Sequence, residues 1–315
     1  MNILAWLGQR ATAALAVGGV AGFAVPSAAE FLRGFLPLLV FVFTAVSFLK
    51  VDPAAIAGSW QRSLLVALLL VWCLIASPLL VSLAFVILPL PEDLEQVAII
   101  WAASPPMTAA IVFTIFLRLD VSLAVSGSLI ATLVVPVTGP PLCLLLAGLP
   151  VEVGGLMLSA RVAMFIGAAA GAAWVVRAII GGERIARRSD QVSGLIVLIL
   201  VAYAASLTAG VGERLATETE HVVLFIAFAF ALNIATQALT GLLFARSDML
   251  QGATAALLAG NRNMSVLCAN LGPAATPDIM LFFAANHVPI YTLPWLLRRM
   301  YAWVSQRNGR YQKPS

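Results

Sequence analysis

Apolar stretches long enough to cross a lipid bilayer follow one another along almost the whole chain. A transmembrane helix needs about 20 predominantly apolar residues, and a series of such stretches leaves little room for any other kind of fold. Only 10% of the 315 residues are charged, whereas about a quarter are charged in soluble domains. The sequence therefore predicts an all-α polytopic membrane protein without a soluble domain.

We predict ten membrane-spanning helices. The first is interrupted by Gln9 and Arg10, and a segment resembling a signal-peptidase site follows it. We expect it to be retained as a helix, because little positive charge precedes it. The ten predicted spans are residues 4–25, 34–49, 63–89, 96–117, 121–148, 155–180, 191–210, 221–245, 250–271 and 275–297.

Positive charge is distributed unevenly between alternate loops. With the N-terminus inside, 14 of the 18 Lys and Arg residues fall in cytoplasmic segments, and the acidic stretches 91–95 and 212–220 fall outside. This asymmetry agrees with the positive-inside rule. We therefore expect a multi-pass protein of the cell (inner) membrane with both termini in the cytoplasm.

Two predicted spans carry helix-breaking or strongly polar residues near their middle. Span four contains two adjacent prolines, which remove backbone donors and clash with the preceding turn. Span nine contains a glycine followed by Asn-Arg-Asn. The breaks lie about half a chain apart, so spans four and nine occupy equivalent places in two halves of five helices. Because five is odd, the second half is inverted relative to the first.

Paired interrupted helices at corresponding positions are typical of the binding sites of secondary transporters. Irregular backbone is tolerated at that depth where protein buries it or where it lines a water-filled cavity. We predict a first repeat at residues 1–150, an inverted repeat at 151–300 and a polar cytoplasmic tail at 301–315. The predicted substrate and crossing region comprises Ser104, Pro105, Pro106, Thr108, Gly260, Asn261, Arg262 and Asn263.

These residues resemble motifs of the bile acid:sodium symporter family and its bacterial homologues. The fourth span of that family carries a pattern like S/C-P-G-G-T-x-S-N, where this chain has SPPMTAAI at 104–111. The ninth span carries a pattern like E-x-G-x-Q-N, where this chain has LAGNRN at 258–263. The likeness in topology covers nearly the whole chain, while the specific motifs are confined to spans three to five and nine.

The resemblance implies a core domain of spans three to five and eight to ten, and a panel domain of spans one, two, six and seven. It also implies that unwound parts of spans four and nine cross in the core, with two sodium ions behind the crossing. This chain departs from the family at the implied sodium ligands, and Ser128 is the one remnant with a side-chain oxygen at the first site. The apolar replacements are Cys73, Ala110, Ile111, Ala124 and Leu258.

Sodium needs several oxygen ligands to replace its hydration shell, so apolar side chains do not form its site. In the ninth span Arg262 replaces the glutamine of the family. The C-terminal ends of half-helices present unpaired carbonyls and the negative end of the helix dipole, which stabilise a cation. We interpret Arg262 as a tethered replacement for a bound cation.

Two interpretations of the charge on Arg262 stay open. In one, backbone carbonyls and Asn261 or Asn263 satisfy the guanidinium, whose role is structural. In the other, the guanidinium also faces a cavity and pairs with an anionic substrate. No Asp or Glu lies within spans three, four, eight or nine to neutralise it.

The leading hypothesis is a secondary transporter that moves a small organic anion by alternating access. His287 in span ten is a candidate proton relay, and a histidine satisfied within the core is the other interpretation. Residual sodium coupling also stays open. An arsenite-type exporter is a second hypothesis, although Pro106 stands where that family has a reactive cysteine. A binding-only membrane receptor or scaffold of the same fold is a third.

We expect no enzyme activity, because the chain has no HExxH, GxSxG or pair of intramembrane acids. Its three cysteines lie in apolar runs without CxxC spacing, so we expect no disulfide framework, metal or cofactor. The expected partners are a small organic anion and the lipid bilayer, with no nucleic acid. Trp60, Trp101 and Tyr301 fit an aromatic belt at the membrane interface, and Asn233 and Gln237 share one face of span eight.

Overall fold

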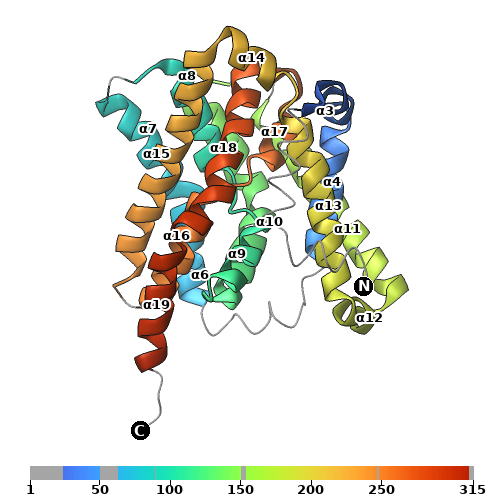
Figure 1. The fold of residues 1–315 in the computed structure, drawn as a ribbon, viewed down its shortest axis with the longest axis vertical. Helices are drawn as coiled ribbons and strands as arrows, with labels where there is room; N and C mark the ends of the chain where they lie inside the picture. Colours follow the sequence, from blue (N-terminus) through green and yellow to red (C-terminus); the bar gives the residue numbers. More distant parts are fainter. Residues whose placement is uncertain (1–23, 50–62, 89, 150–153, 247, 312–315) are drawn as a thin grey trace.

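The computed structural model describes residues 24–49, 63–88, 90–149, 154–246 and 248–311. Every regular element in these residues is a helix (Figure 1). The prediction of an all-α protein is therefore confirmed. The first predicted span, residues 4–25, lies outside the described residues except for its last two positions. Trp60 also lies outside them.

Within the described ranges, six helical segments are long and apolar enough to cross a membrane. A seventh is formed if α3 (Pro26–Arg33) and α4 (Leu36–Leu49), which meet at 71°, count as one bent span. The chain is a multi-pass α-helical membrane protein. The six segments are Ser63–Ile87 (α6, Ser63–Val71; η2, Trp72–Ala76; α7, Ser77–Ile87), Val121–Leu146 (α10), Gly155–Ile180 (α11), Ser189–Thr217 (α13, Ser189–Leu207; α14, Val211–Thr217), Thr219–Phe244 (α15) and Pro277–Leu296 (α18).

Spans four and nine are each divided into two helices, as their sequences predict. The first pair is α8 (Glu92–Ala103) and α9 (Ala110–Phe116), and the second is α16 (Met249–Gly260) and α17 (Ser265–Leu271). Each pair leaves a short non-helical segment in the middle of the molecule. The other predicted spans that fall in the described residues match helical segments within a few residues, except that the segment beginning at Ser189 continues to Thr217, seven residues beyond its predicted end.

The helices form two groups (Figure 1). On one side of the molecule α4 packs against α11 and α13, and α13 also packs against α3. The short helix α12 (Gly182–Arg187) contacts α11 and α13. The other group contains the two broken helices, together with α6, α7, α10, α15 and α18. Helices α10 and α11, which follow each other in the chain, connect the two groups.

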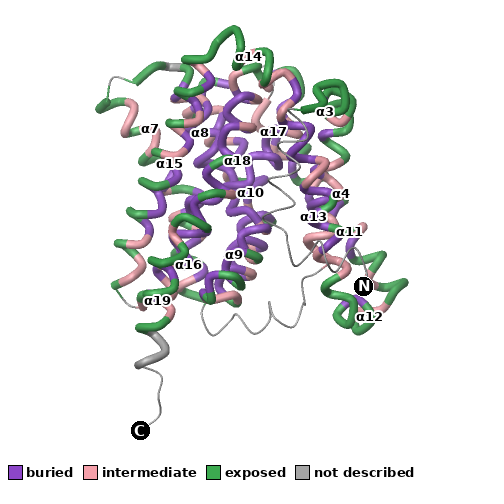
Figure 2. Tube along the Cα trace, in the orientation of Figure 1, coloured by how far each residue is buried: buried purple, intermediate pink, exposed green. Residues whose placement is uncertain are grey.

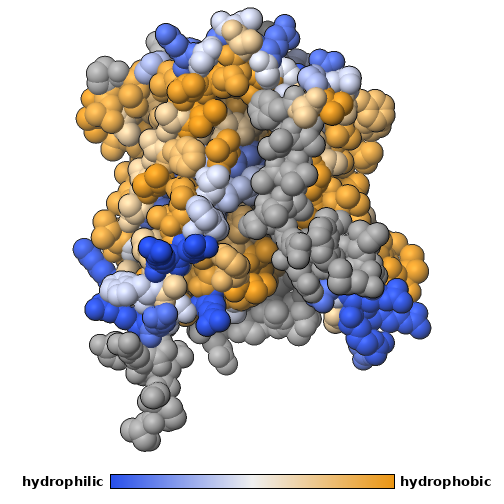
Figure 3. Space-filling model, in the orientation of Figure 1, coloured by the Kyte–Doolittle hydropathy of each residue, from blue (hydrophilic) through white to orange (hydrophobic). Residues whose placement is uncertain are grey.

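Burial is greatest where the broken helices meet α10 and α18 (Figure 2). The outer faces of α11 and α15 carry exposed apolar side chains instead. In the space-filling view these side chains form a broad apolar region between polar ends (Figure 3). This distribution is opposite to that of a soluble protein and matches a molecule whose solvent is lipid.

The segment predicted as a polar tail begins inside a helix, α19 (Arg298–Tyr311). Tyr301 is only 1% exposed, and its hydroxyl donates to Gln237 Oε1 at 2.6 Å. Placing Tyr301 in an interfacial belt is therefore wrong. Tyr301 and Val304 lie three residues apart and face the core together, because side chains at that spacing share one side of a helix.

We expect Tyr301→Phe to lower the free energy of unfolding by about 1 kcal/mol, the net contribution of one buried hydrogen bond. The measurement is thermal or denaturant unfolding of the detergent-solubilised chain. Trp303→Phe is the matched control, because Trp303 is on the same helix and is 49% exposed. Equal stability of Tyr301→Phe and the native chain would show that the hydroxyl does not hold α19 in place.

Candidate functional site

Helix α8 ends where its sequence removes the donors needed to continue it. Ser104 adopts an extended conformation with ψ of 150°, as expected for a residue that precedes a proline. Pro105 and Pro106 have no N–H group, so the carbonyls of the last turn of α8 lack their usual helical partners. The chain then turns and resumes as α9 at Ala110.

Helix α16 ends at Gly260, after which Asn261 leaves the helical conformation with ψ of 87°. Gly260 is required by the close approach of α15. A β-carbon at this position would collide with Gln237 and would lie 2.8 Å from Asn233 Oδ1. The glycine therefore allows the end of α16 to press directly on α15.

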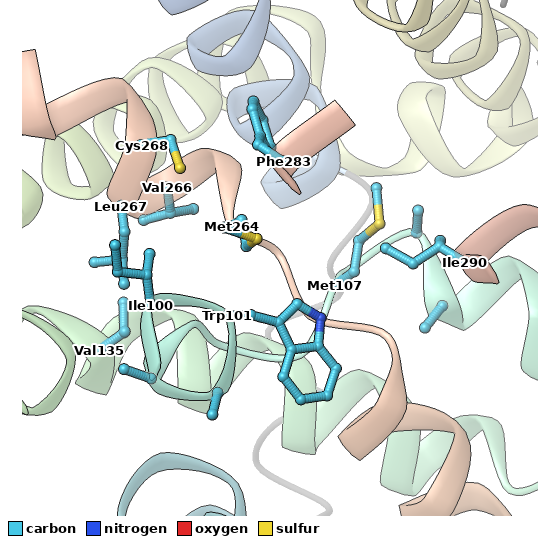
Figure 4. Packing of buried hydrophobic residues seen from close by; sticks show 14 of the residues in the cluster. Ile100, Trp101, Met107, Val135, Met264, Val266, Leu267, Cys268, Phe283 and Ile290 are labelled. Carbon is cyan, nitrogen blue, oxygen red and sulfur yellow. The ribbon is translucent and has the colours of Figure 1, made fainter. Parts of the chain in front are cut away.

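The two non-helical segments cross each other in antiparallel orientation. The N–H of Met107 donates to the Asn261 carbonyl at 2.7 Å, and the N–H of Asn263 donates to the Pro105 carbonyl at 2.7 Å. Pro106 and Arg262 form the isolated bridge between these two bonds. Buried apolar side chains surround the crossing, among them Trp101, Met107 and Met264 (Figure 4). Each break thus supplies hydrogen-bond partners for the other.

The guanidinium of Arg262 lies among backbone carbonyls. Its Nε donates to the Ala259 carbonyl at 2.6 Å, and its Nη1 donates to the carbonyls of Cys73 at 2.7 Å and Ser104 at 3.1 Å. The residue is only 1% exposed. Ala259 and Ser104 belong to the C-terminal ends of α16 and α8, where the helix dipoles are negative. The arginine therefore occupies the place at which these ends would stabilise a cation.

The Cys73 carbonyl is made available by an irregular turn in the Ser63–Ile87 span. Trp72–Ala76 (η2) is a π-helical turn in which the N–H of Ser77 donates to the Trp72 carbonyl. Pro78, five residues after Cys73, has no N–H to offer. The Cys73 carbonyl thus has no π-helical partner and accepts from Arg262 instead. The Cys73 carbonyl was not predicted as a partner of Arg262, and Pro78 is the signal in the sequence that could have indicated it.

Trp101 forms one wall beside the arginine. Its ring centroid lies 5.7 Å from Arg262 Cζ, and its indole N–H donates to Asn286 Oδ1 at 2.8 Å. The residue is 1% exposed, so its assignment to an interfacial belt is wrong. Hydropathy alone does not distinguish an aromatic residue in the core from one at the interface. Trp101 helps to exclude water from the guanidinium.

A chain of side-chain hydrogen bonds from α15 and α19 supports the end of α16. Asn233 Nδ2 donates to the Gly260 carbonyl at 2.6 Å, and Gln237 Nε2 donates to Asn233 Oδ1 at 2.5 Å. The Tyr301 hydroxyl completes the chain through Gln237. The shared face of Asn233 and Gln237 on α15 is therefore used to fix the broken helix.

The two asparagines beside Arg262 do not bind its guanidinium. Asn261 Nδ2 donates to the Leu257 carbonyl at 2.6 Å, and Asn263 Oδ1 accepts from the Ser265 hydroxyl. The hydrogen bonds of the Arg262 guanidinium go to backbone carbonyls, and the contribution considered for Asn261 or Asn263 is absent. Of the eight residues predicted for the crossing, seven are buried and only Thr108 is partly exposed.

Ser128 and His287 are also buried. The Ser128 hydroxyl donates to the Ala124 carbonyl of its own helix at 2.7 Å. His287 Nδ1 lies 2.7 Å from the Phe283 carbonyl and must donate to it, so Nε2 accepts from the Tyr203 hydroxyl at 3.2 Å. No carboxylate in the described residues contacts the histidine, and no hydrogen bond links it to Arg262.

The positions implied as sodium ligands are filled by apolar groups. Cys73, Ala110, Ala124 and Leu258 are completely buried. A methyl group of Leu258 lies 3.3 Å from where a β-carbon on Gly127 would stand, so little space remains there. In the described ranges no group of three or more His, Cys, Asp or Glu residues could hold a metal ion.

Two cavities formed by described residues lie away from the crossing. One of about 210 Å³ lies between α3, α13, α14 and α18, where Arg33 and Arg214 contribute to its wall. Another of about 360 Å³ lies where α9 ends and α19 begins. In this conformation the guanidinium of Arg262 is separated from both.

No protein-family model matches this sequence, and no curated protein matches it either. The resemblance to bile acid:sodium symporters therefore rests on the motifs at residues 104–111 and 258–263. It remains a prediction.

We expect Gly260→Ala to destabilise the chain by about 1–3 kcal/mol, the range typical of overpacking in a close-packed core. The added methyl group would displace Gln237 and weaken the contact between α15 and α16. Unfolding of the purified chain measures the effect. Gly171→Ala is the control, because a β-carbon there meets no atom within 4 Å. A similar loss in both variants would contradict a special role for Gly260.

We expect Arg262→Ala to lower stability by about 1–3 kcal/mol for each buried carbonyl that loses its donor, the usual cost of leaving a buried polar group unsatisfied. Guanidinium ion at non-denaturing concentration should restore part of the loss, because it can reoccupy the space between the carbonyls. Urea, which has a similar shape but no charge, should not. Equal rescue by both compounds in an unfolding assay would show that the site does not require a cation.

Proposed function

We propose that the chain is a secondary transporter that carries a small organic anion by alternating access. The observation that carries this proposal is the crossing, in which two helices broken at equivalent positions share backbone hydrogen bonds. Broken helices of this kind supply the binding sites of many transporters, and the two bundles on either side of such a site rock during transport.

The proposal includes ten spans in two inverted repeats, at residues 1–150 and 151–300, in the cell (inner) membrane with both termini cytoplasmic. Six long apolar helices, one bent pair and two broken helices follow one another in the predicted order, which supports this topology. The packing of α4, α11 and α13 as one group and of the broken helices within another supports a panel and a core. Such domains are what the resemblance to bile acid:sodium symporters implies.

We further propose that Arg262 acts as a tethered cation at the crossing. Three carbonyl contacts and almost complete burial favour this role over direct pairing with a substrate. An arginine side chain keeps its charge and does not dissociate from the protein. Transport would then proceed without sodium at the sites that the family resemblance implies, and His287 would remain the candidate for proton coupling.

Thr108 is our candidate for a contact with the substrate. It directly follows Met107, whose N–H bonds to the other broken segment. It is also the partly exposed member of the predicted set. A ligand at the crossing could therefore contact this side chain, whereas Arg262 is only 1% exposed.

The test is counterflow of labelled aliphatic, aromatic and sterol carboxylates in proteoliposomes, in sodium and in choline buffer. We expect at least one anion to exchange at the same rate in both buffers. Thr108→Val should reduce that rate. Thr292→Val should not, since Thr292 is exposed on α18 and its hydroxyl donates to the Val288 carbonyl of its own helix.

A requirement for sodium would contradict the role given to Arg262. Specific anion binding without any flux would favour the binding-only receptor or scaffold. An arsenite-type exporter is less compatible with the site, because Pro106 stands at the bridge where a reactive cysteine would be needed. Efflux of arsenite from loaded vesicles would nevertheless identify that activity directly.

A further inference from the structure

Helices α9 and α19 can be followed in Figure 1. A cavity with three arginines in its wall lies where α9 ends and α19 begins. Its volume is about 360 Å³. The arginines come from two segments far apart in the sequence, so folding has brought their charges together. The polar groups in its wall are Arg118, Arg298, Arg299, Ser305 and Gln306.

The described wall of this cavity contains no acidic residue. Within the described part of the chain, no ion pair involves any of the three arginines. Asp120, the acid nearest to Arg118 in sequence, caps α10 by accepting from the N–H of Leu123 at 3.0 Å. Three guanidinium groups on one cavity repel one another, and a bound anion would relieve that repulsion.

Arg118 occupies a backbone position that normally favours glycine. Its φ is 56°, and it is the one non-glycine residue with positive φ in the described ranges. The N–H of Leu119 donates to the Thr114 carbonyl at 2.9 Å, and the N–H of Arg118 donates to the Ile115 carbonyl at 3.2 Å. These are the two bonds of a Schellman motif, in which glycine is the usual residue at the left-handed position. The turn itself does not need an arginine side chain.

Charge and apolar surface meet at this cavity. Arg298 lies over the ring of Trp295, with its Cζ 4.9 Å from the centroid. This stacking orients a guanidinium while its in-plane N–H groups can still donate. Trp295 and Phe116 are 56% and 60% exposed and belong to the apolar surface of the protein. A ligand in this cavity can therefore place a charged group among arginines and hydrocarbon beside Phe116, which forms part of the wall.

We propose that this cavity binds a negatively charged phosphate group, supplied by an acidic phospholipid of the surrounding bilayer. Guanidinium groups match phosphate oxygens with paired N–H donors. Basic pockets between helices at the end of a transmembrane domain are typical binding places for such headgroups. The proposal concerns a site distinct from the crossing and does not depend on which substrate is transported.

The experiment measures retention of phosphatidylglycerol and phosphatidylcholine by the full-length chain, using native mass spectrometry after titration in detergent. We expect phosphatidylglycerol to be retained preferentially. Each arginine near a phosphate surface strengthens binding by about 1 kcal/mol, which is roughly fivefold. Replacing both Arg298 and Arg299 by Gln should therefore weaken the binding of phosphatidylglycerol about 30-fold. The control replaces Arg184 and Arg188 by Gln, which removes the same charge from the region of α12.

Arg118→Gly separates the role of the side chain from that of the turn. Glycine fits the left-handed conformation without strain, so the thermal midpoint should be unchanged or higher. Binding of phosphatidylglycerol should nevertheless weaken about fivefold. Unchanged binding in this variant and in the Arg298→Gln, Arg299→Gln variant would overturn the proposal, as would an equal loss in the Arg184, Arg188 control.

Soluble glycerol phosphate distinguishes the two sources of the phosphate. If it does not displace the lipid, the hydrocarbon chains contribute and phospholipid is the ligand. If it displaces the lipid completely, the phosphate recognition stands but a soluble phosphate compound can fill the site. Equal retention of phosphatidylcholine and phosphatidylglycerol would overturn the proposal. None of these outcomes depends on anion flux, so the transport proposal is tested separately.

Discussion

A peptide group in the middle of a membrane has no water to bond with, and this constraint governs the centre of the molecule. Two helices end there, so their last carbonyls and the intervening N–H groups need partners from elsewhere. The antiparallel crossing supplies part of them, through the bonds of Met107 and Asn263. Arg262 supplies donors for carbonyls on three separate spans. The positions of α8, α16 and the π-helical turn therefore depend on one another.

A buried arginine at this depth costs at least about 2.5–3.5 kcal/mol on insertion scales. A hydrogen bond to a charged group contributes about 1.5–3 kcal/mol, so three carbonyl contacts are of the order needed to offset that cost. The same contacts explain why no carboxylate is needed beside the guanidinium. A mobile cation in this place could be exchanged with solvent, whereas a side chain remains throughout any conformational cycle. Under our proposal this difference separates the protein from sodium-driven carriers.

Hydropathy and helix-breaking residues predicted both interruptions and most span boundaries within the described residues, because the cost of burying polar backbone leaves strong signals in the sequence. The same reasoning misplaced Trp101 and Tyr301. Their burial depends on which face of a helix packs inward, and an apolar helix in lipid has little amphipathic pattern to show this. The Cys73 carbonyl could not be identified as a partner of Arg262, since a backbone acceptor leaves no side-chain signal and lies 189 residues away. Only Pro78 marked the position.

That sequence separation has a consequence for biosynthesis. The Ser63–Ile87 span and α8 enter the membrane well before residue 262 has been made. At about 5–20 residues per second, the carbonyls of Cys73 and Ser104 would wait roughly 10–40 s for their donor. During this interval the first half of the protein is inserted but its central contacts are incomplete. Assembly of the core is therefore a late event, completed when the ninth span joins helices that are already in the bilayer.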